Sequence, residues 1–336
     1  MAPRRPGRLT GARASLRTEN VVRDRSRIDL DTYTPHGPAY QASQSAALHD
    51  FLFWIFHNGL SCNLVSLVAA PRICAALVLA FGRNSCQLGK PLYAYLCLVT
   101  SLERLSPDLR GAFGQPWQLA SDWRIIEPAE HRLPTPAPLF RAMLLLAWVA
   151  GWTRWAGVTL IAYVGPGRIG EVLRAKRAFL VLPSDNLGEH EDRAFVRVPN
   201  PKSGNRGGAS VQHITVVGPR WVRMLVAAFG SLQDEELLYP MSPATYRSRW
   251  DTLLRALHVP RSLALTPGGL RGGGAVDMYL ADRPIADIMW RMRLRDQSSL
   301  AHYLQEVAAV SSLRALPQDA RDAVASCNGF FLRLFG

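Results

Sequence analysis

Four side chains, three basic groups and one tyrosine, stand at junctions of the chain and have the chemistry to handle a phosphate group. Arg168 opens a helical segment, Lys202 lies in a long turn between two strand-like segments, and Arg271 lies among five glycines in LTPGGLRGGG. Tyr303 follows 32 residues after Arg271. Guanidinium groups donate paired hydrogen bonds to phosphate oxygens, and a tyrosine oxygen is a nucleophile. Each residue alone is equally explained as a solvated or core side chain, so their order matters.

That order resembles the tyrosine recombinase (phage integrase) family. In that family G-x-R-x-x-E opens a helix before a small sheet, a lysine lies on a hairpin of the sheet, H-x-x-R opens a later helix, and a nucleophilic tyrosine follows. Here GRIGE contains Arg168 and Glu171, NPKSGNR contains Lys202, and GGLR contains Arg271. The segment RPIADIM at 283–289 matches the apolar helix before the tyrosine. The resemblance covers about residues 121–310.

The resemblance implies DNA strand breakage and rejoining through a covalent 3′-phosphotyrosine on Tyr303. Arg168 and Arg271 would bind the nonbridging oxygens more strongly in the transition state, and Lys202 would protonate the departing 5′ oxygen. Glu171 would orient Arg168. Neither a metal nor another cofactor is implied, and the expected partners are double-stranded DNA and a homotetramer assembled on it.

Two positions depart from the family pattern. Three residues before Arg271, where the family carries histidine or lysine, stands Gly268; nine before Tyr303, where it carries histidine or tryptophan, stands Leu294. Neither side chain donates a hydrogen bond. An alternative function is therefore a catalytically impaired DNA-binding protein that keeps the fold, and a third is an arginine-rich helical scaffold or membrane-surface protein.

Basic and aromatic residues near these gaps offer substitutes. We hypothesise that Arg293 or Arg295 supplies a phosphate contact, with Trp290 as a further supporting residue. The segment WRMRLR is either a basic helix face or a helix that lies against a DNA backbone. In the second case Arg291 contacts DNA, as does Arg206 in the turn that holds the lysine.

The glycine-rich stretch is not a nucleotide-binding loop. A P-loop needs G-x-x-x-x-G-K-[ST], and the stretch has neither the lysine nor the hydroxyl in place. A glycine inside a helix costs about 1 kcal/mol relative to alanine. We expect Gly272, Gly273 and Gly274 to allow a close backbone approach behind Arg271, to DNA or to a neighbouring helix.

The composition favours a polyanionic partner. The chain has 336 residues, a formal net charge of +13 and only three lysines, so the charge comes from arginine. Nucleic acid and an anionic membrane surface both fit this excess, and a GC-rich coding sequence also explains the bias. The odd number of cysteines, five, without a C-x-x-C pair, indicates a reduced, intracellular protein. If the source is eukaryotic, a mobile-element recombinase in the nucleus is the simplest context.

The sequence predicts a mainly α protein with a small antiparallel sheet (α+β), in which a helical core-binding domain precedes a recombinase-like catalytic domain. Residues 1–44 read as a disordered basic arm, with organelle targeting as an open alternative. The helical DNA-clamping domain is placed at 45–120 and the catalytic domain at 121–336, with strands at 178–182, 194–199 and 211–217. The apolar run Ala142 to Trp152 is too short to span a membrane, so we expect no stable membrane association. The apolar end, Phe330 to Phe335, is predicted to dock onto a neighbouring protomer.

Overall fold

The computed structural model describes residues 37–128, 132–199, 201 and 211–336. Contacts divide the chain into two units, Met1–Ala129 and Glu130–Gly336, and each is described by itself. The predicted basic arm lies outside the described residues up to position 36. Among the described residues, no helix is long and apolar enough to cross a membrane.

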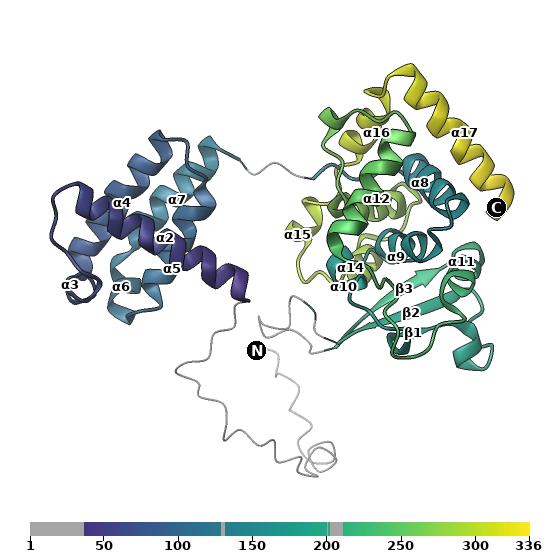
Figure 1. Cartoon of the computed structure of the whole chain (residues 1–336), viewed down its shortest axis with the longest axis horizontal. Coiled ribbons are helices and arrows are strands. Elements are labelled where there is room, and N and C mark those ends of the chain that lie inside the picture. Colours follow the sequence, from purple (N-terminus) through teal and green to yellow (C-terminus); the bar gives the residue numbers. More distant parts are fainter. Residues whose placement is uncertain (1–36, 129–131, 200, 202–210) are drawn as a thin grey trace, which may run out of the picture. The chain divides into compact units, whose positions relative to one another are not determined.

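The first unit is helical throughout its described elements (Figure 1). Its core is formed by large apolar side chains such as Phe51, Leu98 and Trp123. The last of these belongs to a helix that continues past residue 120, so this unit extends beyond the boundary expected from the sequence. Its helices are α2 (Pro38–His57), α3 (Leu64–Ala69), α4 (Pro71–Gln87), α5 (Leu92–Glu103), α6 (Pro107–Ala112) and α7 (Gly114–Ile126).

The start of α2 corrects the predicted arm. Residues 38–44 were expected to be disordered, but they form the first turns of a helix that Pro38 opens. Proline suits this position because its missing N–H would have no helical partner there. Gln44 is buried and donates to the Thr100 hydroxyl at 3.3 Å, and the Tyr40 hydroxyl lies 3.0 Å from the same oxygen. These contacts with α5 hold the segment in the fold.

The second unit is built around two apolar helices, α8 (Ala137–Val149) and α9 (Thr153–Val164). Every residue of α9 from Trp155 to Tyr163 is buried, which explains why its sequence lacks a polar face. Helices α11, α13 and α17 pack against this pair. The other elements are α10 (Ile169–Val172), α11 (Pro219–Phe229), α12 (Pro243–Ala256), α13 (Leu270–Leu280), α14 (Ile285–Met292), α15 (Gln297–Ala301), α16 (Glu306–Arg314) and α17 (Gln318–Phe335).

A three-stranded antiparallel sheet completes this unit, in the order β1 (Leu180–Val181), β2 (Arg193–Val198) and β3 (Gln212–Val217). Val196 of β2 lies opposite both Leu180 and Ile214, and the alternate residues of β2 point into the core. The predicted mainly α fold with a small antiparallel sheet is confirmed. The first strand is shorter than expected, because a 3₁₀ turn at Arg177–Phe179 precedes it and Arg177 is bonded to Asp185 at 2.8 Å.

The C-terminal helix α17 lies along α8 of its own chain (Figure 1). Phe331 is fully buried and stacks on Trp221, and Phe335 meets the Trp148 ring edge-on. These apolar side chains were expected to dock onto a neighbouring protomer, but they pack in their own core. Phe330, Leu332 and Leu334 are exposed on the other side of the helix.

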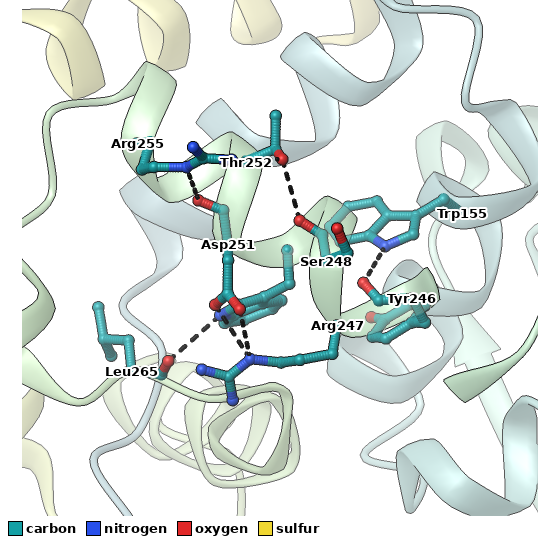
Figure 2. A network of polar contacts seen from close by, with 9 residues as sticks. Trp155, Tyr246, Arg247, Ser248, Asp251, Thr252, Arg255 and Leu265 are labelled. Atoms are coloured by element: carbon teal, nitrogen blue, oxygen red, sulfur yellow. Dashed lines mark hydrogen bonds and ion pairs between the residues drawn. The ribbon is translucent and has the colours of Figure 1, made fainter. Parts of the chain in front are cut away.

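Helix α12 holds the beginning of the glycine-rich stretch (Figure 2). Ser242 caps this helix by accepting a hydrogen bond from the Thr245 amide. The Trp155 indole donates to the Tyr246 carbonyl at 3.2 Å, which ties α12 to α9. The Trp250 indole donates to the Leu265 carbonyl at 3.3 Å. The chain therefore enters the segment before Arg271 from a point fixed on the core.

Candidate active site

A cavity of about 700 Å³ in the second unit brings together residues from distant parts of the sequence. Residues of the turn that opens α10, of the glycine-rich stretch and of the turn after α15 line it. Its lining includes four arginines and one glutamate, which leaves three positive charges. A cavity of this charge suits an anion with several oxygens. The charged residues are Arg132, Arg168, Arg174, Arg271 and Glu171.

Glu171 is shared by two arginines. It is buried on α10 and accepts from Arg168 at 3.0 Å and from Arg293 at 2.7 Å. Burial opposes its ionisation, but the charges of Arg293 and Arg168 outweigh burial and lower its pKa. The carboxylate therefore stays ionised and offsets one of the two guanidinium charges.

Arg293, which is paired with Glu171, has an unusual backbone conformation. It ends α14 with φ of 57°, a left-handed value that costs a residue with a side chain about 1–2 kcal/mol. Its guanidinium also donates to the Gln212 side chain of β3 at 3.2 Å. These contacts join the end of α14 to α10 and to the sheet, and they fix Glu171 beside Arg168.

Arg271 is the most deeply buried cation of the cavity, with 4% of its surface exposed. It lies in the first turn of α13 and donates from Nη2 to the Met292 carbonyl. Its Nε and Nη1 atoms have no hydrogen-bond partner among the described residues. Burial, and then the nearby charge of Arg168, lowers the pKa of Arg271 to about 10, so it is still charged at neutral pH. A bound anion would supply the partners and the charge that are missing.

Tyr303 lies beside this arginine, in the turn that follows α15. Its amide donates to the Leu300 carbonyl at 2.8 Å, and its half-buried ring packs against a small apolar cluster that includes Ile288 and Met292. The guanidinium of Arg271 lies over the ring, 5.3 Å from its centre. The tyrosine thus lines the same cavity as Arg168 and Arg271.

The glycines around Arg271 allow segments of protein backbone to approach α13. A Cβ on Gly274 would lie 2.9 Å from the Tyr163 carbonyl carbon of α9, and a Cβ on Gly273 would lie 3.1 Å from that of Thr135. The Thr135 amide donates to the Gly269 carbonyl at 3.1 Å. Of the two expected neighbours, a helix and DNA, the structure supplies a helix, together with the segment before α8.

The remaining predicted residues either lie outside the described part of the chain or do not line the cavity. Lys202 and Arg206 lie outside the described residues. Trp290 is 82% exposed, and Arg291 is bonded to Asp287 at 3.1 Å. None of the described residues Trp290, Arg291, Arg293 and Arg295 lines the cavity. A direct phosphate contact by Arg293 or Arg295 was hypothesised. Arg293 instead acts on the site through its ion pair with Glu171.

Sequence reasoning missed two arginines of the cavity. Arg174 follows Glu171 by three residues, as Glu171 follows Arg168. In a helix this spacing places the three side chains on one face, and that pattern could have indicated Arg174 as a site residue. Arg132 stands in the polar, proline-rich segment EPAEHRLPTPAP, Glu127 to Pro138, whose composition is typical of an extended interdomain connection. No local pattern indicates its position. In the part of the chain that the structure describes, no group of three or more His, Cys, Asp or Glu residues could hold a metal ion.

The chain is similar in fold to proteins of known structure. No family model matches the sequence, and no curated protein matches it. Solved structures are similar to it, among them XerA recombinase and a lambda integrase. The crystal structure of XerA recombinase is 13% identical, with a TM-score of 0.41, and the match covers 81% of this chain and 98% of that chain. The structure of a lambda integrase dimer bound to a COC′ core site is 14% identical, with a TM-score of 0.46, and covers 84% of this chain and 85% of that chain. At this low identity, the similarity concerns the fold alone.

Proposed function

We propose that the cavity binds a DNA phosphodiester and that Tyr303 attacks its phosphorus. The observation that carries the proposal is Arg271, a buried guanidinium beside the tyrosine, with two nitrogens that have no hydrogen-bond partner among the described residues. A phosphodiester has two nonbridging oxygens, which match the forked donors of an arginine. The net charge of +13 favours a polyanion as the source of that group.

The proposed step exchanges one phosphodiester for another. The Tyr303 oxygen bonds to phosphorus, the bond from phosphorus to the 5′ oxygen breaks, and the phenolic proton is balanced by a proton that ends on the 5′ oxygen. Arg168 and Arg271 stabilise the negative charge that grows on the nonbridging oxygens. Glu171 positions Arg168 through the 3.0 Å ion pair. Lys202 stays the predicted donor to the 5′ oxygen.

Because the 3′-phosphotyrosine keeps the energy of the broken bond, the 5′ hydroxyl of another strand can reverse the step. Breakage followed by attack of a different strand is recombination or integration of DNA. We extend the proposal to a homotetramer on duplex DNA and to an intracellular location, the nucleus for a eukaryotic source.

A DNA-binding protein that has lost turnover is the second candidate function. It is favoured by Gly268 and Leu294, whose side chains offer no proton or hydrogen bond to the reacting group. Leu294 packs against the apolar cluster of Ile288 and Met292. Loss of one assisting group costs on the order of 10²-fold in rate.

A covalent trapping experiment separates these two functions without a known target. The substrate is a pool of duplexes of random sequence with a nick, so that the short strand released by cleavage diffuses away and rejoining cannot occur. The proposal expects a denaturation-resistant protein–DNA adduct whose modified peptide contains Tyr303. Tyr303→Phe should abolish the adduct. Tyr279→Phe is the matched control, because Tyr279 is an exposed tyrosine on α13.

Duplex binding supplies the second readout. If the wild type forms no adduct but binds duplex DNA, and Arg271→Gln weakens the binding, the non-enzymatic function holds. The affinity should also fall steeply as salt rises, because phosphate contacts release counterions. Weak, salt-independent duplex binding would contradict both functions and favour a scaffold or membrane-surface protein.

A further inference from the structure

Arg132 occupies the space next to Gly268. A Cβ built on Gly268 would lie 2.8 Å from the Arg132 Cδ and 3.0 Å from its Cζ, with Nη1 closer still. Real Cβ atoms essentially never come as close to another atom as the Cδ and Nη1 distances, and the Cζ distance is tighter than most real Cβ contacts. A Cβ at position 268 would therefore shift the Arg132 side chain from this position, whereas glycine leaves the position open.

The segment that carries Arg132 is anchored to the wall of the cavity. Pro134, Thr135 and Pro136 are buried, and the Thr135 amide is bonded to the Gly269 carbonyl. A Cβ on Gly272 would lie 3.6 Å from the Pro134 Cβ, an ordinary contact distance. The backbone next to Arg132 is thus held by α13, although the Arg132 residue itself is exposed.

The position of Arg132 gives it access to an anion in the cavity. It lines the cavity with Arg168, Arg174 and Arg271. Arg168 donates a hydrogen bond to Glu171, and Arg271 donates one to the Met292 carbonyl, so part of each guanidinium is already bound to the protein. An exposed guanidinium on a long side chain reaches a ligand at little desolvation cost, and its charge adds to the attraction of the site.

We infer that Arg132 is a third phosphate-binding arginine, and that Gly268 is required to make room for it. The inference rests on the proposed function, since the ligand is a phosphate in the same cavity. It supplies a cationic donor next to position 268, whose own side chain can offer none. The donor comes from the segment before α8, more than a hundred residues away in sequence.

The test measures binding of inorganic phosphate to the full chain, from the rise in melting temperature as phosphate replaces chloride at constant ionic strength. Arg132→Gln should raise the Kd about tenfold, which is the typical weight of one charge-assisted hydrogen bond. Gly268→Ala should raise the Kd by a similar factor, because the added Cβ displaces the guanidinium. Arg314→Gln is the charge-matched control, since Arg314 is exposed on α16 and does not line the cavity.

The double variant decides whether the two residues act together. If Gly268 acts by admitting Arg132, Gly268→Ala should add nothing in the Arg132→Gln background. Full additivity of the two effects, or an Arg132→Gln variant that binds phosphate like Arg314→Gln, overturns the inference.

Two further variants separate this inference from the proposed function. If Arg271→Gln and Arg168→Gln weaken phosphate binding while Arg132→Gln does not, only the inference on Arg132 fails. If neither Arg271→Gln nor Arg168→Gln changes the Kd, the anion site itself is refuted and the inference fails with it. Arg168→Gln covers the case in which the buried Arg271 variant does not fold, because the Arg168 side chain is 28% exposed.

Discussion

The guanidinium of Arg271 lies over the ring of Tyr303, with 5.3 Å between its central carbon and the ring centre. The arginine comes from the first turn of α13 and the tyrosine from the turn after α15. A cation over an aromatic face is attracted by the ring, and this contact holds the two groups in one wall of the cavity. A phosphate bound by Arg271 would therefore lie close to the tyrosine.

This arrangement predicts that a lysine cannot replace Arg271. An ammonium group donates from a single nitrogen and lacks the arginine fork, so it matches the Met292 carbonyl and two phosphate oxygens less well than a guanidinium does. We expect Arg271→Lys to weaken phosphate binding about tenfold or more and to lower the free energy of unfolding by roughly 1–3 kcal/mol. Phosphate titration and urea unfolding measure the two effects. Arg223→Lys, at an exposed position of α11, should change neither.

Glu171 is predicted to matter for stability because two arginines depend on it. Glu171→Gln leaves Arg293 buried without a counter-charge, and breaking such a pair costs about 3–5 kcal/mol. Urea unfolding at neutral pH should show a loss near the lower end of that range, since glutamine still accepts hydrogen bonds. Asp251→Asn is the control, because the Arg247–Asp251 pair is 45% exposed on both sides and should cost under about 1 kcal/mol.

The same variant predicts a pH dependence. The pKa of Glu171 is lowered in the folded protein, so its contribution is fully present above the unfolded pKa of about 4.3 and is lost as the pH falls through the folded pKa. The difference in unfolding free energy between wild type and Glu171→Gln should therefore be largest near neutral pH and should close in acid. A difference that stays constant down to low pH would show that the carboxylate charge is not the cause.

Leu294→His is predicted not to create an assisting group. The leucine packs against Ile288, Met292 and Leu300 and does not line the cavity. A histidine there would place a polar ring against a partly buried apolar cluster, and we expect a stability loss of about 1–3 kcal/mol with no gain in adduct formation. Leu280→His, at an exposed site of α13, should be close to neutral. A large gain in cleavage by Leu294→His would contradict the placement of position 294 away from the reacting group.

Gly274→Ala tests the packing role of the glycine run. The added Cβ would press on the Tyr163 backbone of α9, which cannot move aside as a flexible side chain can. We expect a loss of about 1–3 kcal/mol in unfolding free energy. Gly329→Ala is the matched helical control on α17, where a Cβ meets nothing within 4 Å and should stabilise by about 0.5–1 kcal/mol. Equal effects of the two substitutions would contradict close packing at Gly274.

The sequence by itself predicted the order of the elements and the residues to which the proposed chemistry is assigned. A strand was predicted at 194–199, and the structure has β2 there, with Ala194, Val196 and Val198 buried. The apolar run Ala142 to Trp152 was predicted to be too short for a membrane span, and most of it lies in the largely buried helix α8. These features depend on local patterns, because the period of apolar residues sets which face of an element is buried.

Only the tertiary structure decided which charges meet. Glu171 joins Arg168, three residues away, to Arg293, which is 122 residues away, and Arg132 reaches Gly268 only because the segment 132–136 docks on α13. The glycines could be assigned to close packing from sequence, but not their partners. Contacts between distant segments depend on how helices and loops pack in three dimensions, and no spacing along the chain encodes that distance.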